Sequence, residues 1–445
     1  MENVREKAIK AKKSSVIIAN VKAITKNNAL LNMAKALDSE RAKIIGANKV
    51  DLEDAKKLLE KGELTSSIVK RLEVTDDKIN EMINGIRDVA KLEDPLGKTI
   101  SALELDTGLE LYQIATPIGV IGMVFESRPD VVPQIISLAL KSGNCVLLKG
   151  GKESANTNKA IFNILINSLN DRDIPKDSFQ LLEKREDVNE MLKLERYIDL
   201  IIPRGSNEFV QFVQSNTKIP VLGHANGICH AYVDKYFDEK KAIEVCFDAK
   251  VQYPAVCNAI ETLLVHRESA DIFLPKIGRK YKEAKVEMRC CDRSYGILRE
   301  LGVKKATEED WSTEYNNLII SIKIIDSVKD AVEHINNYGS HHTDTIITEN
   351  EENADYFLRY VDSSSVMLNA STRFSDGFRY GKGAEVGIST GKIHARGPTG
   401  MEGLLIYKYI LLGKGHKVSD YVGSNAKSYS HKKLNDTIEN ALKKL

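Results

Sequence analysis

The cysteines are the residues of this sequence that could supply a nucleophile. The 445-residue chain has no C-x-x-C pair, and this argues against zinc ribbons and thioredoxin-type chemistry. Reduced thiols in a cytoplasm are the simple interpretation. A thiolate is strongly nucleophilic, but a scattered cysteine is more often a small buried side chain. Each of the six must therefore be judged separately: Cys145, Cys229, Cys246, Cys257, Cys290 and Cys291.

Cys257 is the strongest candidate among them. It lies in the segment VQYPAVCNAIETLLVH, just after a break at Pro254. A cysteine at the start of an ordered element can have its thiolate stabilised by backbone N–H groups. This position alone does not show whether Cys257 is a small buried residue or a nucleophile. Its role must be inferred from the sequence segments around it.

Two other motifs, of a hydrolase nucleophile and of a P-loop, are matched only in part. GISTG at Gly387 to Gly391 fits the G-x-S-x-G pattern of a hydrolase, but the KIHARGPTG that follows cannot open the required helix cleanly. STGK at Ser389 to Lys392 lacks the leading glycine of a P-loop, and no G-x-G-x-x-G follows the first strand of the predicted sheet. A dinucleotide would have to bind without the usual phosphate fingerprint.

Four histidines raise the question of a metal site: His224, His230, His341 and His342. They have no regular spacing to acidic or cysteine ligands. We therefore interpret them as scattered polar residues and predict no metal.

The elements that must position Cys257 follow from hydrophobic periodicity. Residues 1 to about 90 read as helices, and 98–117 read as a hairpin around Asp106-Thr107-Gly108. From Ile118, continuous apolar strands alternate with helices, and a second such series begins near His230. This order predicts an α/β fold with two α/β domains and buried parallel sheets. The Gly-rich stretch 374–403 is predicted to be a functional loop region, and the polar last 25 or so residues to end in an amphipathic surface helix.

Composition limits the partners. The chain is 42% hydrophobic and 29% charged, with a formal net charge of +1, which argues against nucleic acid or anionic membrane as a main partner. No apolar run reaches the roughly 18 residues needed to cross a bilayer, and the N-terminus has no apolar signal segment. A cytoplasmic protein of two or three domains is expected.

Six segments in unbroken order resemble the aldehyde dehydrogenase superfamily, and most closely its branch that reduces glutamyl phosphate. The similarity runs to about Gly413, and it implies that Cys257 is the catalytic nucleophile. The segments are ATPIGVIGMVFESRPDV, VLLKGGKES, GHANGICHAYVD, QYPAVCNA, HINNYGSHHTDTI and AEVGISTGKIHARGPTGMEGL.

The resemblance also implies roles for the parts of the chain. Residues 1–97 and 118–228 would form the cofactor-binding domain, and 229–400 the catalytic domain. The hairpin 98–117 and a strand in 401–414 would serve homo-oligomerisation, leaving 415–445 as a C-terminal tail.

Carried over by position, Lys149 would contact the adenosine ribose of the cofactor. Lys152 stands where members that prefer NAD carry a carboxylate, and a cation there favours the 2′-phosphate of NADPH, although Glu153 beside it weakens this inference. Gly205 and Ser206 match the Gly-Ser that opens a helix under the dinucleotide phosphates.

Two departures from hydrolytic aldehyde dehydrogenases indicate the reaction. Val221 replaces the glutamate that activates water, so a thioester on Cys257 would not be hydrolysed. Ser127 replaces an asparagine that helps bind the oxyanion; it could still donate one hydrogen bond alongside the backbone N–H of Cys257. Arg128, next to it, suits a phosphate or carboxylate.

The resemblance implies L-glutamate 5-phosphate as substrate and L-glutamate 5-semialdehyde as product, the second step of proline biosynthesis. Arg128, Arg373 and Arg396 are candidate anion anchors, although each is equally well explained as a solvated or structural arginine. Asn369 and Ser371 are candidates for holding the α-amino and α-carboxylate groups. A glutamate kinase, which supplies the unstable acyl phosphate, is a candidate partner. An acylating dehydrogenase that uses coenzyme A and an inactive oligomeric scaffold stay open as alternatives.

Overall fold

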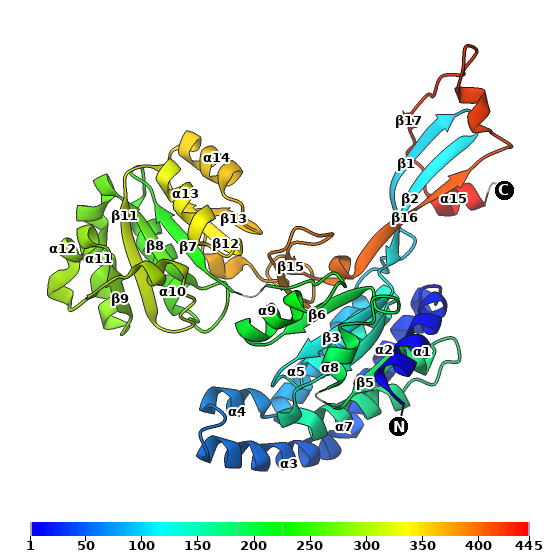
Figure 1. Ribbon diagram of the computed structural model, residues 1–445, viewed down its shortest axis with the longest axis horizontal. Coiled ribbons are helices and arrows are strands. Elements are labelled where there is room, and N and C mark those ends of the chain that lie inside the picture. Colours follow the sequence, from blue (N-terminus) through cyan, green and yellow to red (C-terminus); the bar gives the residue numbers. More distant parts are fainter. Residues whose placement is uncertain (1, 185, 225, 444–445) are drawn as a thin grey trace. The chain divides into compact units, whose positions relative to one another are not determined.

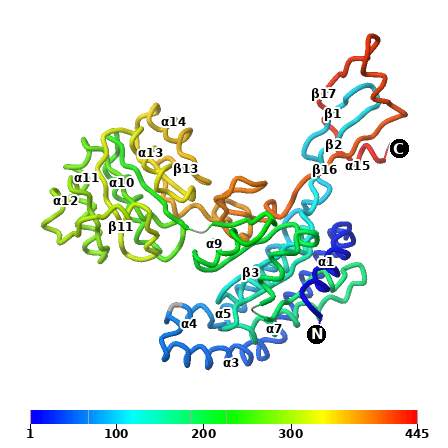
Figure 2. The backbone as a smooth tube through the Cα atoms, in the orientation of Figure 1, coloured from blue at the N-terminus to red at the C-terminus, as the bar shows by residue number. Residues whose placement is uncertain are grey.

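The computed structural model describes residues 2–184, 186–224 and 226–443, and the chain divides into two units (Figure 1). Unit 1 comprises Met1–Val221 and Gly400–Leu445, and unit 2 comprises Leu222–Thr399. The sequence predicted domain boundaries after residues 228 and 400. Figure 2 follows the chain through both units and shows that unit 1 is built from the two ends of the sequence.

The predicted N-terminal helices are present in unit 1. Capping residues mark where the first and the fifth of them begin: the side chain of Asn3 accepts from the N–H of Glu6, which completes a capping box, and Thr75 caps the fifth helix. The fifth helix buries Ile79, Ile83 and Ile86 along one face. The five are α1 (Val4–Ile18), α2 (Ala23–Ser39), α3 (Arg41–Glu60), α4 (Ser66–Leu72) and α5 (Asp76–Lys91).

A four-stranded parallel sheet forms the centre of unit 1, in the order β5-β4-β3-β6. Its strands are β3 (Val120–Phe125), β4 (Cys145–Lys149), β5 (Phe179–Leu182) and β6 (Leu200–Arg204). β3 and β4 are buried at every position because helices cover the sheet. The connecting helices are α6 (Val131–Ser142), α7 (Ala155–Asn167), α8 (Asp187–Met191) and α9 (Asn207–Ser215).

A second sheet of unit 1 contains the predicted hairpin, in the order β16-β2-β1-β17. β1 (Thr99–Asp106) and β2 (Leu109–Pro117) turn at Gly108, whose φ of 74° favours glycine. β16 (Leu405–Leu412) pairs with β2. The predicted tail also joins this sheet: β17 (Lys432–Lys433) pairs with β1, and α15 (Ile438–Leu442) buries Ile438 and Ala441 beneath it. The last two residues of the tail lie outside the described residues.

Unit 2 is built on a seven-stranded parallel sheet, in the order β10-β9-β11-β8-β7-β12-β13. Alternate residues of β7 enter different cores: Ala231 and Val233 pack in one cluster and Tyr232 in another, so both faces are buried. The strands are β7 (Cys229–Val233), β8 (Ile260–His266), β9 (Glu287–Cys290), β10 (Lys304–Lys305), β11 (Ile319–Ile325), β12 (Thr343–Ile347) and β13 (Ser365–Leu368).

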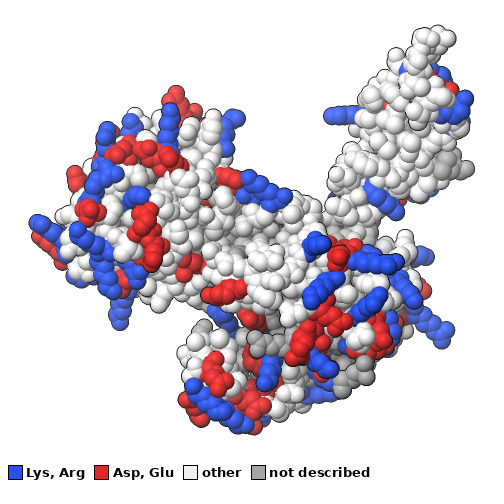
Figure 3. Space-filling view, viewed as in Figure 1, with Lys and Arg blue, Asp and Glu red and all other residues white. Residues whose placement is uncertain are grey.

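Five helices cover this sheet, and the strands β14 (Gly387–Ser389) and β15 (Gly397–Thr399) form a small antiparallel pair within the Gly-rich stretch. The helices are α10 (Glu239–Val251), α11 (Arg267–Glu283), α12 (Asp292–Leu298), α13 (Val328–Tyr338) and α14 (Glu351–Tyr360). No helix among the described residues is long and apolar enough to span a membrane. Figure 3 shows acidic and basic side chains interspersed over the face drawn, in keeping with the small net charge.

Candidate active site

Cys257 lies in the loop between α10 and β8, and the two ends of that loop are tied together. Lys250, near the end of α10, donates to Glu261 on β8 at 2.5 Å, and both side chains are buried. Burial raises the pKa of Glu261 to about 7, while the ammonium of Lys250 acts against that shift. This pair fixes where the chain leaves the helix and enters the sheet.

The loop itself is a tight turn. The N–H of Ala259 donates to the carbonyl of Val256 at 3.0 Å, and the side chain of Asn258 donates to the carbonyl of Ser375 at 2.8 Å. Gly227 passes so close that an added Cβ would lie 2.4 Å from the carbonyl oxygen of Cys257. The element that follows Cys257 is a strand, so no helix begins at this thiol. Packing therefore holds the half-buried Cys257 in place.

The other cysteines differ from Cys257 in exposure. Cys145, Cys229, Cys246 and Cys290 are buried, and burial raises the pKa of Cys145 and of Cys290 to about 12. Cys291 is half-buried: burial opposes its ionisation, but hydrogen bonds to its sulfur from Ser294 and other groups outweigh burial and lower its pKa. Among the six, only Cys257 and Cys291 are accessible enough to react.

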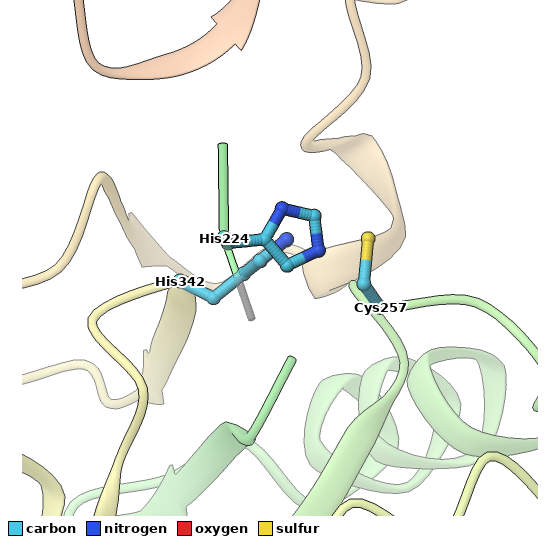
Figure 4. A group of neighbouring side chains, drawn as sticks. All are labelled: His224, Cys257 and His342. Carbon is cyan, nitrogen blue, oxygen red and sulfur yellow. The ribbon is translucent and has the colours of Figure 1, made fainter. Parts of the chain in front are cut away.

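Two histidines lie next to Cys257 (Figure 4). One ligand-type atom from each of His224, Cys257 and His342 lies within 4.8 Å of the others. The rings of the two histidines meet edge to face, with centroids 4.8 Å apart. The prediction of scattered histidines is therefore wrong for this pair, because residues distant in sequence meet where the loop before β7, the Cys257 loop and the start of β12 come together.

Hydrogen bonds orient both rings. Nδ1 of His224 lies 2.7 Å from the carbonyl oxygen of Ile388 on β14, and a carbonyl can only accept, so this nitrogen carries the proton. His342 is fully buried, and its Nδ1 lies 2.9 Å from Oγ1 of Thr343 and 3.5 Å from Sγ of Cys229. Its Nε2 has no hydrogen-bond partner among the described residues. The other two histidines lie apart from this group: His230 pairs with Asp344 at 2.8 Å, and His341 bonds to the carbonyl of Asp362.

The arginines proposed as anion anchors in unit 2 already have partners. Arg373 is buried; it donates from Nε to Gln252 at 3.0 Å and also bonds to Asn258, so it braces the Cys257 loop on both sides. Arg396 bonds to Asp362 at 3.0 Å and to the carbonyl of Thr390.

The two polar candidates near them are also occupied. The amide of Asn369 bonds to the backbone of Thr348 on both sides, at 3.0 and 2.9 Å, and its φ of 53° places it in a turn. Oγ of Ser371 accepts from the N–H of Arg373. All of these contacts suit structural roles, and the assignment of these residues to substrate binding stays a prediction.

Ser127 and Arg128 follow β3 in unit 1. The N–H and the hydroxyl of Ser127 both donate to one carboxylate oxygen of Glu153, at 2.8 and 2.6 Å. Its donor is therefore used within unit 1, and its predicted role at an oxyanion is untested. Arg128 is exposed, and its guanidinium makes no hydrogen bond or ion pair with the residues that the structure describes, while its carbonyl accepts from the N–H of Val131 at 3.1 Å.

The start of α9 can receive an anion. An added Cβ on Gly205 would lie 2.3 Å from a carboxylate oxygen of Glu126, so a larger residue would displace this carboxylate from its present place. The N–H of Ser206 donates to the same carboxylate at 2.9 Å, and the hydroxyl of Ser206 caps the helix. A negatively charged group of the chain itself thus occupies the helix N-terminus, which is where the resemblance places the cofactor phosphates.

The two candidate cofactor lysines differ in environment. Lys149 is buried at the end of β4, where burial lowers its pKa, and its Nζ donates to the carbonyl of Gly150. Lys152 is exposed at the start of the short 3₁₀ turn Lys152–Ser154. Glu153, which weakened the prediction for Lys152, turns instead toward Ser127.

Comparison with known proteins agrees with this architecture. Residues 2–295 match the aldehyde dehydrogenase family. The chain is 60% identical over 444 residues, 99% of either chain, to the gamma-glutamyl phosphate reductase of Methanococcoides burtonii. The crystal structure of gamma-glutamyl phosphate reductase from Thermotoga maritima superposes with a TM-score of 0.90 at 42% identity, over 94% of this chain and 100% of that one. The chain belongs to the aldehyde dehydrogenase family and has its fold, and within that family it groups with the gamma-glutamyl phosphate reductases.

Proposed function

We propose that this protein reduces L-glutamate 5-phosphate to L-glutamate 5-semialdehyde with NADPH, releasing phosphate, in the second step of proline biosynthesis. The observation that carries the proposal is the 60% identity to a gamma-glutamyl phosphate reductase along nearly the whole chain. Identity of this extent covers both units and every segment that carries a candidate residue. The half-buried Cys257 in its braced turn supports the chemical route.

In this route the thiolate of Cys257 attacks the acyl carbon of the acyl phosphate. The carbon–sulfur bond forms, the carbon–oxygen bond to phosphate breaks, and phosphate leaves with the electron pair. NADPH, when bound, supplies the hydride that reduces the resulting thioester. The thiohemiacetal on Cys257 then collapses to the aldehyde and restores the thiolate. The backbone N–H of Cys257 is the first proposed donor to the oxyanion. The hydroxyl of Ser127 is the second, and to act it must turn from Glu153, which the N–H of Ser127 still holds.

The residues proposed to hold NADPH fit that ligand. Gly205 and Ser206 form a helix N-terminus that already accepts the carboxylate of Glu126, so it accepts anions. Lys149 is proposed to contact the ribose. Lys152 is proposed to select the 2′-phosphate, and Glu153, the carboxylate next to it in sequence, is hydrogen-bonded to Ser127.

Val221 is proposed to protect the thioester. It stands where hydrolytic relatives carry the base that activates water, and its isopropyl group can neither accept a proton nor orient a water molecule. Its backbone continues the edge of the unit 1 sheet beside Ile201. The activated acyl group would then be kept for reduction.

Arg128 is the preferred anion anchor of the substrate. It is exposed, and its guanidinium is not committed to any described residue, whereas Arg373 and Arg396 are already paired. A guanidinium suits the bidentate geometry of phosphate or carboxylate. The roles of Arg373, Arg396, Asn369 and Ser371 in substrate binding remain part of the proposal with less support.

An assay in the reverse direction tests the function. NADP⁺ reduction should require both the semialdehyde and inorganic phosphate, and NAD⁺ should substitute poorly. Replacement of phosphate by coenzyme A tests the acylating alternative, which predicts activity with the thiol. The acetylating aldehyde dehydrogenase of Geobacillus thermoglucosidasius shares only the fold at 17% identity. Absence of phosphate-dependent reduction in folded protein would contradict the proposal.

We also propose a homo-oligomer formed through β16. This edge strand pairs with β2 on one side, and Tyr409 and Leu411 are 59% and 54% exposed on the face opposite the small core under the sheet. Converting both to lysine should weaken self-association at least about 30-fold, because apolar anchors carry most interface energy. Sedimentation velocity measures this effect, and Val418→Lys in the exposed tail is the control. An unchanged mass distribution would contradict this interface. A glutamate kinase remains a proposed partner.

A further inference from the structure

The group of His224, Cys257 and His342 has the composition of a metal site. A thiolate and two imidazoles are the ligand types that borderline-soft divalent cations such as Zn²⁺ prefer, whereas Mg²⁺ and Ca²⁺ prefer oxygen. One donor atom from each residue lies within 4.8 Å of the others. We infer that these three side chains form a binding site for Zn²⁺, with Cys257 as the thiolate ligand.

The hydrogen bonds of both histidines are compatible with metal binding through Nε2. Because Nδ1 of His224 donates to the carbonyl of Ile388, the lone pair of the neutral ring lies on Nε2. For His342, Nδ1 faces Oγ1 of Thr343 at 2.9 Å and Sγ of Cys229 at 3.5 Å, and both atoms can accept its proton because Sγ of Cys229 donates to the carbonyl of Cys257. These contacts are the outer partners that metal-binding histidines require to fix the tautomer.

His342 gives an independent indication that a ligand belongs here. Its Nε2 is fully buried and has no hydrogen-bond partner among the described residues. A buried polar atom without a partner is destabilising, and most such atoms in folded proteins are satisfied. Coordination to a cation held between His342, His224 and Cys257 would satisfy it.

The geometry requires only a small movement. Tetrahedral zinc places its nitrogen and sulfur ligands roughly 3.5 Å apart, so the three atoms would close by about 1 Å. The backbone positions are well fixed: Gly227 packs against the Cys257 turn, and His342 directly precedes β12. Three protein ligands leave the fourth position for water, which is typical of zinc sites that remain open.

Metal binding would block the reaction. A thiolate bound to zinc no longer has its attacking electron pair available for the acyl carbon, so Zn²⁺ would inhibit the enzyme reversibly. This consequence rests on the proposed role of Cys257 as nucleophile. Binding of the metal does not rest on that role, so metal binding and inhibition can be tested separately.

Binding is tested with the full-length protein after treatment with a chelator and a reductant. Titration with Zn²⁺ against a chromophoric chelator should reveal one site. Co²⁺, as a spectroscopic probe, should give the thiolate-to-metal charge-transfer absorption of a cysteine ligand. His342→Asn and His224→Asn should each weaken Zn²⁺ binding more than the roughly 10- to 100-fold that loss of an outer partner costs. Cys257→Ser should abolish the charge-transfer band.

His341→Asn is the matched control. This neighbour lies outside the group, and its φ of 59° is a conformation that asparagine tolerates, so the variant should fold and bind Zn²⁺ like the parent. Circular dichroism checks the folding of each variant. Because two different histidines are replaced, the metal site can still be tested with one variant if the other does not fold. Zinc affinity that is unchanged in a folded His342→Asn or His224→Asn variant, or a cobalt spectrum without a thiolate band, would overturn the site.

Inhibition is then measured on the same preparations. Zn²⁺ should inhibit phosphate-dependent NADP⁺ reduction at the concentrations that fill the site, and EDTA should restore it. Bound Zn²⁺ should also protect Cys257 from alkylation. If Cys257→Ser kept full activity, the proposed nucleophile would fail, yet the cobalt spectrum of the parent would still report the metal site. A filled site with undiminished activity would overturn the inhibitory part of the inference.

Discussion

The two units hold their candidate functional groups in different ways. In unit 1 the candidate groups are bonded to other parts of the same unit: the proposed oxyanion donor Ser127 to Glu153, and the proposed cofactor ligands Ser206 to Glu126 and Lys149 to a backbone carbonyl. In unit 2 the surroundings of Cys257 are braced by many contacts, but the facing Nε2 of His342 has no described partner. The candidate anion site at Ser206 is satisfied by the chain's own carboxylate, whereas the group beside Cys257 keeps one buried polar atom without a described partner.

This comparison suggests that ligand binding has different consequences in the two units. A cofactor phosphate at α9 would replace the carboxylate of Glu126, exchanging one anion for another at the same N–H groups. A ligand beside Cys257 would satisfy a buried atom that lacks a partner. Changes in unit 1 should therefore alter selectivity among ligands, and changes around Cys257 should remove activity altogether.

The largest expected effect tests the unit 2 side of the comparison. Cys257→Ser should lower phosphate-dependent NADP⁺ reduction by at least about 10³-fold, because a hydroxyl without a base is a far weaker nucleophile than a thiolate. Cys291→Ser, at the other half-buried cysteine, should retain parental activity. The initial rate at saturating substrate measures both. A Cys257→Ser enzyme with more than a tenth of the parental rate would contradict the covalent route.

The next effect concerns selectivity in unit 1. Lys152→Glu should reduce the preference for NADPH over NADH about 10- to 100-fold, since a carboxylate repels the 2′-phosphate and accepts a hydrogen bond from the 2′-hydroxyl. The ratio of kcat/KM for the two cofactors is the measurement. Lys193→Glu makes the same change of charge at another exposed position of unit 1, and as the control it should keep the parental ratio. An unchanged ratio in Lys152→Glu would remove this residue as the selector.

Val221 offers a gain of function, which few structural defects can imitate. Val221→Glu should raise NADP⁺ reduction by the semialdehyde in the absence of phosphate about tenfold, because a carboxylate there can activate water against the thioester. Val221→Gln places a side chain of nearly the same shape as glutamate at this position but supplies no general base, so it should show no such gain. Equal rates in the two variants would show that shape rather than proton transfer matters at this position.

Much of the fold could be predicted from the sequence because local patterns specify it. Buried parallel strands such as β3 and β4 are continuous apolar runs, and they were found for that reason. Residues 267–305, which contain the 17-residue helix α11, are harder to predict. Pro275 lies inside α11, where proline normally ends a helix, and β9 alternates buried and half-buried residues over only four positions.

The site was predictable only in part, for a different reason. Cys257 was identified because its neighbours resemble a known family. The histidines beside it were missed because residues 224, 257 and 342 meet only through the parallel order of the sheet, which no local spacing reveals. The segments GHANGICH and GSHHTD held the relevant signal, since two His-containing motifs flanked strands that proved to be neighbours.

His334 sharpens the comparison. Like His342 and His230 it is a buried histidine of unit 2 whose Nε2 lacks a described partner, yet it lies outside the Cys257 group, among Trp311, Tyr338 and His230. Burial lowers its pKa to about 2, and the charges of His230 and Lys323 act in the same direction. The unfolded chain binds a proton at this residue below pH 6.5, whereas the folded protein does not until about pH 2. Stability from this residue is therefore complete above pH 6.5 and falls as the pH is lowered, by up to about 1.4 kcal/mol per pH unit.

His334→Phe removes the titrating group while keeping an aromatic ring against Trp311. Between pH 7 and pH 5 the parent should lose about 2 kcal/mol more unfolding free energy than the variant. Urea denaturation followed by fluorescence measures this, since Trp311 is the only tryptophan of the chain and reports on unit 2. His431→Asn, at an exposed histidine with a φ of 44°, should keep the parental pH dependence. Parallel pH profiles for the parent and His334→Phe would mean that this imidazole titrates alike in the folded and unfolded chains, and that a buried nitrogen without a partner marks no special environment in this unit.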